Sequence, residues 1–104
     1  MMSIKKQFLK SKPECKVTFK FEKRADLSPT SVKVVGNFND WNQQTDPMKQ
    51  LKSGDHTQTI YLPSGSQIQF RYLVNDSIWL NDQDADSFID AGMGNADKNS
   101  VLQL

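Results

Sequence analysis

The sequence is poor in the residues on which catalytic and metal sites usually depend. Its 104 residues include one cysteine, Cys15, and one histidine, His56. A single cysteine cannot form an intramolecular disulfide, and it excludes a zinc site built from several cysteines. Cys15 stands in an alternating pattern of apolar and polar residues, so we expect it to be a small core residue. The scarcity of cysteine favours a cytoplasmic location.

Long apolar runs and an excess of charge are also missing. No apolar run approaches the roughly 18 residues that a transmembrane helix requires. The 13 basic and 12 acidic residues give a formal net charge of +1 and are mixed along the chain. A nucleic-acid-binding domain normally carries a strong basic patch. We therefore expect neither a membrane nor a nucleic acid as a partner.

The sequence offers no recognisable catalytic arrangement. The five glycines are scattered, so there is no glycine-rich phosphate loop. His56 has no nucleophile motif around it, and we expect it to be structural or merely exposed. These observations predict that the protein is not an enzyme and uses no cofactor.

One acidic segment begins like a calcium-binding loop. Asp82, Asp84 and Asp86 alternate as carboxylates do at the start of a helix–loop–helix calcium site. Such a site needs glycine at its sixth position and glutamate at its twelfth, where this chain has Ser87 and Met93. A surface loop also gives no apolar cover to raise one carboxyl pKa, which disfavours a glycosidase acid–base pair. With an incidental calcium ion as the alternative, we expect a solvated loop and no metal site.

The hydrophobic pattern has a period of two residues, which indicates strands rather than helices. Strand patterns bounded by turn-forming residues occur at 15–22, 31–38, 47–52, 57–62, 68–74, 78–80 and 100–104. About seven short strands at these intervals predict an all-β fold, an immunoglobulin-like two-sheet antiparallel β-sandwich. We expect residues 14–104 to form this domain and residues 1–13 to be a flexible N-terminal arm or an edge extension.

Two tryptophans stand in polar surroundings. Trp41 lies in a loop rich in asparagine and aspartate, and Trp79 follows a turn. The ordinary role of each would be burial at the end of the sandwich, because tryptophan is usually well buried. The alternative is a sugar platform. The C–H face of a pyranose ring stacks on the electron-rich indole face, while polar neighbours bind the hydroxyls.

The segment Val34–Trp41, Val-Val-Gly-Asn-Phe-Asn-Asp-Trp, resembles the hallmark of carbohydrate-binding module family 48. That family includes the glycogen-binding domain of the AMP-activated protein kinase beta subunit and the early-set N-terminal domains of isoamylases and branching enzymes. Further matches follow in the family's order over residues 15–104: Pro47-Met48, Leu62-Pro63-Ser64-Gly65, Phe70–Asn75, Trp79 and Asn99-Ser100-Val101. The resemblance implies an early-set sandwich that binds α-glucans without catalysis.

The same resemblance implies a set of sugar-binding residues. Trp41 and Trp79 match the two stacking tryptophans of the family. Arg71 stands where the kinase-type domains have a lysine that bonds sugar hydroxyls, and Asn99 matches an asparagine with the same role.

Two further positions and the ligands also follow from the resemblance. Met93 and Asn95 fall where the family has leucine and threonine beside the bound glucan. The implied partners are α-1,4-linked glucans: glycogen, starch, maltooligosaccharides and β-cyclodextrin. The alternative is a protein-interaction module that docks on a glucan-processing enzyme and binds no sugar of its own.

Overall fold

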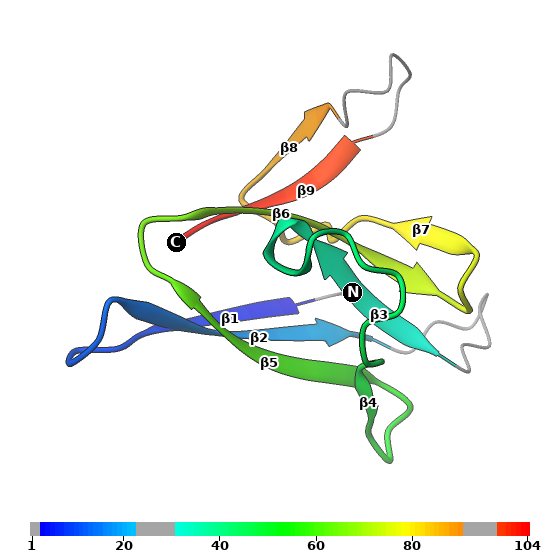
Figure 1. Ribbon diagram of the computed structural model, residues 1–104. Coiled ribbons are helices and arrows are strands. Elements are labelled where there is room, and N and C mark those ends of the chain that lie inside the picture. The colour runs from blue at the N-terminus through cyan, green and yellow to red at the C-terminus, as the bar shows by residue number, and fades with distance from the viewer. Residues whose placement is uncertain (1–2, 23–30, 91–97) are drawn as a thin grey trace.

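The computed structural model describes residues 3–22, 31–90 and 98–104, in which two antiparallel sheets face each other (Figure 1). The first sheet has the order β1-β2-β5-β4, with strands Ser3–Phe8, Glu14–Phe21, His56–Pro63 and Lys49–Gln50. The second has the order β3-β6-β9-β8, with strands Val32–Gly36, Gln67–Val74, Lys98–Gln103 and Ser87–Asp90. Strand β7, Ile78–Leu80, pairs with β6, and a 3-10 turn, η1, spans Asn37–Asn39. Within the described ranges, no helix has the length and apolarity to cross a membrane.

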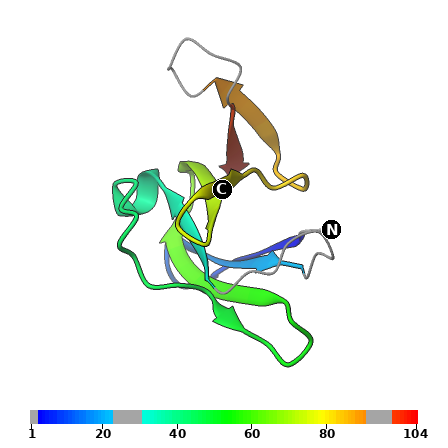
Figure 2. The ribbon, with the colours of Figure 1, turned by 90° about the vertical axis from the view of Figure 1, so that its right-hand side faces the viewer.

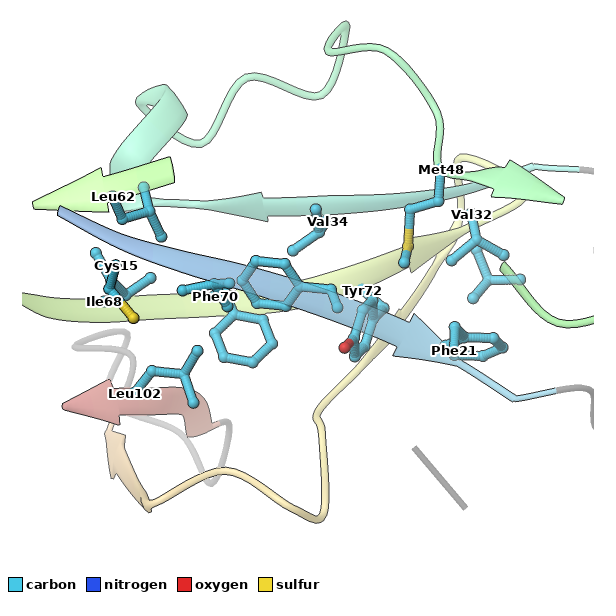
Figure 3. Packing of buried hydrophobic residues seen from close by; sticks show 13 residues of the cluster. Cys15, Phe21, Val32, Val34, Met48, Leu62, Ile68, Phe70, Tyr72 and Leu102 are labelled. Carbon is cyan, nitrogen blue, oxygen red and sulfur yellow. The ribbon is translucent and has the colours of Figure 1, made fainter. Parts of the chain in front are cut away.

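The core fills the space between the sheets, as Figure 3 shows. Phe19 and Phe21 of β2 meet Phe70 and Tyr72 of β6 edge to face, with ring centroids 5.1 and 5.4 Å apart. Such aromatic pairs contribute about 0.5–1.5 kcal/mol each beyond the burial of their area. Cys15 is a buried free cysteine of this core. The structure thus confirms the predicted all-β two-sheet sandwich and the core role of Cys15.

Two edge strands extend the sheets beyond the seven segments that the sequence pattern indicated. β1 pairs with β2 from Ser3 opposite Lys20 to Phe8 opposite Cys15 and forms one edge of the first sheet. β8 lies within the polar stretch after β7, and all four of its residues are exposed. The β8–β9 hairpin projects beyond the rest of the sandwich (Figures 1 and 2). Since β8 does not pack on the core, its sequence carries no alternating pattern.

The acidic loop is not wholly solvated, and the expectation is wrong for Asp82, which is fully buried. The Tyr72 hydroxyl donates to Asp82 Oδ2 over 2.7 Å, and the backbone N–H of Asp84 donates to Asp82 Oδ1 over 2.8 Å. The backbone N–H of Asp82 donates to the Ser100 hydroxyl over 2.9 Å. Burial raises the pKa of both Asp82 and Tyr72, because it disfavours their charged forms. This network ties the loop after β7 to the core.

Tyr72→Phe should lower the free energy of unfolding by about 1–3 kcal/mol, because it leaves the buried Asp82 carboxyl without its hydroxyl donor. Urea denaturation at pH 7 measures the change. Tyr61→Phe is the matched control, since Tyr61 is exposed, and its unfolding free energy should stay within about 0.5 kcal/mol of wild type. Equal effects of the two substitutions would contradict a structural role for the Tyr72–Asp82 bond.

His56 is structural rather than exposed: only 2% of it is accessible. It begins β5 opposite Phe21, and among the described residues its Nδ1 finds no hydrogen-bond partner. Burial lowers the pKa of His56, because the imidazolium is poorly solvated there, and the nearby Asp55 carboxylate only partly opposes this. A buried, neutral imidazole with an unpaired nitrogen is a weak point of the core.

The lowered pKa of His56 makes stability depend on pH. The unfolded chain takes up a proton near pH 6.5 and the folded chain only at lower pH. Stability is therefore full above about pH 6.5, falls as the pH drops from there to the folded pKa, and levels off below it, where both states are protonated. His56→Phe should remove this loss. Urea unfolding of both proteins between pH 7 and pH 5 should show their difference growing in favour of the variant. A constant difference across this range would contradict the account.

Candidate functional site

The turn that carries Trp41 is built by the asparagines of the hallmark motif. Asn39, the last residue of η1, accepts the Gly36 backbone N–H at its Oδ1 over 3.0 Å and donates from its Nδ2 to the Val34 carbonyl over 3.2 Å. Between the asparagines, Phe38 packs against the core, with its ring centroid 6.2 Å from that of Phe19. The chain therefore leaves β3 in a fixed direction.

Asn37 attaches the same turn to the neighbouring strand β6. Its Oδ1 accepts the backbone N–H of Gln69 over 3.1 Å, and its Nδ2 donates to the carbonyl of Gln67 over 3.2 Å. These bonds continue the β3–β6 ladder past the point where backbone pairing ends, at Gly36 opposite Phe70. The asparagines in this motif are thus used for structure.

Trp41 follows this turn in an unusual backbone conformation. Asp40 and Trp41 have φ angles of 57° and 55°, in the left-handed region. That conformation costs a bulky residue on the order of 1–2 kcal/mol. A hydrogen bond of 2.9 Å from the Trp41 N–H to the Gly36 carbonyl holds it, and the residue is half-buried. Further along the loop, Lys33 Nζ donates to the Gln43 carbonyl over 2.8 Å, which fixes the loop beside β3.

Trp79 lies in β7, opposite Leu73 of β6, and is 36% exposed. The turn before it is closed by two left-handed residues, Asn75 and Asp76, with φ angles of 52° and 59°. Asparagine and aspartate tolerate this conformation better than most residues do. Asp76 also pairs with Lys33 on β3 over 3.0 Å. These contacts keep β7 in register and leave the indole accessible.

Arg71 and Asn99 contact each other directly. The Arg71 Nε donates to Asn99 Oδ1 over 2.8 Å, and the Asn99 Nδ2 donates to Gln69 Oε1 over 3.3 Å. Only 7% of Asn99 is exposed, whereas Arg71 is half-buried. In the part of the chain that the structure describes, the terminal guanidinium nitrogens of Arg71 have no hydrogen-bond partner. The sequence prediction missed Gln69, although its place two residues before Arg71 puts it on the same face of the strand.

These side chains share the outer face of the second sheet. Arg71 and Leu73 are two residues apart on β6, so both point to the outer face. Strand pairing places Val35 opposite Arg71 and Trp79 opposite Leu73, on this same face. Val35 and Leu73 are buried but lie outside the core cluster, so this outer face is covered around them. Two elements border this outer face: β7, which pairs with β6, and the loop after η1, which Lys33 bonds at Gln43.

The outer face thus brings together Arg71, Asn99 and Trp79, and the loop that carries Trp41 borders it. Neither tryptophan is among the buried core residues. No ring contact joins the two indoles within residues 3–22, 31–90 and 98–104. Met93 and Asn95 lie outside the described residues.

The acidic segment offers little for a metal ion or for catalysis. Asp82 uses both carboxyl oxygens in the network with Tyr72 and Asp84. The hydrogen bond from Lys6 to Asp86, helped by the Gln103 N–H, lowers the pKa of Asp86. No group of three or more His, Cys, Asp or Glu residues suited to a metal occurs within the described ranges.

A family model described as the glycogen recognition site of AMP-activated protein kinase matches residues 15–99. The chain belongs to this glycogen-recognition family. The match runs from the start of β2 into β9 and includes the positions of Trp41, Arg71 and Trp79. No curated protein matches the chain. Membership of a glycogen-recognition family confirms the resemblance seen in the sequence and supports glucan binding by this chain.

In this glycogen-recognition domain, Gly36 is required by space and not by backbone conformation, because its φ of −166° is extended. A Cβ atom there would lie 2.3 Å from the Gln69 carbonyl oxygen and 2.8 Å from the Phe38 ring. Gly36→Ala should therefore lower the free energy of unfolding by about 3 kcal/mol, as severe overpacking does.

Gly65→Ala is the control for Gly36→Ala. Gly65 has a left-handed φ of 84° but open space around it, so its substitution should cost only about 1 kcal/mol. Urea denaturation compares the two variants. A larger loss for Gly65→Ala than for Gly36→Ala would contradict the steric account of Gly36.

Proposed function

We propose that the chain is a non-catalytic α-glucan-binding module whose site is the outer face of the second sheet. The observation that carries the proposal is the placement of an exposed Trp79 on the face that also presents the Arg71–Asn99 pair. Family membership supplies the ligand class. The ligands proposed are glycogen, starch, maltooligosaccharides and β-cyclodextrin.

The chemistry of this face suits a sugar chain. A pyranose ring stacked on the Trp79 indole removes its C–H face from water, while its hydroxyls remain at the rim. The bond from Arg71 Nε to Asn99 fixes the guanidinium plane, so its terminal nitrogens are presented as hydroxyl donors. We assign to Trp41, at the border of this face, a second stacking contact. Met93 and Asn95 are proposed as contacts from the family resemblance alone.

The site is a surface with few charged groups, so its affinity for a short oligosaccharide should be modest. A few stacking contacts and hydrogen bonds, offset by the cost of association, correspond to a dissociation constant on the order of micromolar to millimolar. Tight retention on glycogen would then come from the many equivalent chain ends of the polymer.

Trp79→Ala should weaken binding to maltoheptaose at least about tenfold, about 1.4 kcal/mol, because it removes a stacking surface. Trp41→Ala should have a similar effect. Both variants should lose co-sedimentation with glycogen. Calorimetric titration measures the affinity, and circular dichroism of each variant checks that the sandwich remains folded.

Phe88→Ala is a matched control, because it also removes an exposed aromatic ring, one that is 48% accessible. Phe88 is paired with Ser100, whereas its neighbour Ile89 is paired with Asn99, so Phe88 points to the other side of the sheet. This variant should bind like wild type. Folded tryptophan variants that still bind maltoheptaose like wild type would refute the site. A wild-type chain that does not bind glycogen would favour the docking module instead.

A further inference from the structure

The outer face of the first sheet carries an aromatic ring that the core does not use. Tyr61 follows Thr57 and Thr59 at alternate positions of β5, pointing away from the core, and is 54% exposed. Strand pairing places Lys16 of β2 opposite it. A large exposed tyrosine ring flanked by polar groups can serve as a platform for a ligand.

Tyr61 borders a shallow, open groove of about 600 Å³ on the surface of the first sheet. The groove is lined by Leu9, Lys10, Ser11, Lys12, Glu14 and Tyr61.

Two backbone hydrogen bonds fix the loop that lines the groove. The Leu9 N–H donates to the Glu14 carbonyl over 3.1 Å, and the Ser64 N–H donates to the Pro13 carbonyl over 2.9 Å. The second bond ties this β1–β2 turn to the turn between β5 and β6. The groove is therefore preformed at its backbone.

The lining combines cations, a carboxylate and a hydroxyl around one ring. Lys10 and Lys12 form no ion pair with another residue in the described part of the chain, so their ammonium groups are available as donors. Glu14 supplies an acceptor and would repel a phosphate or another carboxylate. A neutral ligand with many hydroxyls, which both donate and accept, fits this mixture better than an anion does.

We propose that the Tyr61 groove is a second α-glucan contact site, in which a glucose ring stacks on Tyr61 and its hydroxyls bond Lys10, Lys12 and Glu14. The ligand class rests on the function proposed above. Since the two sheets pack core to core (Figure 1), this groove and the Trp79 face lie on the outer faces of opposite sheets. One chain could then contact two branches of a glucan and gain avidity on the polymer.

Backbone amide NMR during titration with maltoheptaose tests the groove directly. Two separate sets of amides should shift. One set surrounds Arg71, Trp79 and Asn99, and the other comprises Leu9–Glu14 with Tyr61. Tyr61→Ala should abolish the second set and keep the first, whereas Trp79→Ala should do the reverse. Lys49→Ala, an exposed position on the same sheet in β4, should keep both sets.

The two proposals fail in distinguishable ways. Shifts confined to the set around Trp79 would overturn the Tyr61 site and leave the proposed function standing. Shifts confined to the Tyr61 groove would overturn the assignment of the Trp79 face. A groove whose amides shift with inorganic phosphate and not with maltoheptaose would be an anion site, which also overturns the proposal.

Discussion

The edge-to-face packing of Phe19 and Phe21 on Phe70 and Tyr72 is the contact on which the rest of this structure depends. It joins the two sheets through β2 and β6. Because side chains alternate along a strand, fixing Phe70 and Tyr72 in the core also fixes Arg71 and its outward neighbours on the opposite face. The same strand, β6, therefore contributes Phe70 and Tyr72 to the core on one side and Arg71 to the candidate glucan site on the other.

The residues of the hallmark motif have different roles, which the family resemblance alone does not reveal. Gly36, Asn37 and Asn39 build a turn, through a close backbone approach and side-chain hydrogen bonds to β3 and β6. Trp41 follows this turn in a left-handed conformation, with its N–H bonded to the Gly36 carbonyl. Since the glycine and both asparagines have structural roles, the proposed contact of this motif with a glucan is assigned to the indole of Trp41.

Much of the fold could be predicted because most strands face the core on one side only. Their sequences therefore alternate between apolar and polar residues. β8 was not predicted because all four of its residues are exposed. The burial of Asp82 was not predicted because its partner, Tyr72, comes from another strand. For the site, the motif order indicated Trp79, Arg71 and Asn99. The support that Gln69 gives to Asn99 depends on strand pairing, which a single sequence does not display.

The central claim is that this member of a glycogen-recognition family binds α-glucans through its tryptophans. Titration of the wild-type chain with β-cyclodextrin or maltoheptaose, followed by intrinsic tryptophan fluorescence, tests it most directly. A stacked sugar changes the polarity around an exposed indole. The account predicts a saturable change in emission with these α-glucans and none with a β-1,4-linked oligosaccharide of equal length. An emission spectrum that no α-glucan alters up to millimolar concentration would contradict it.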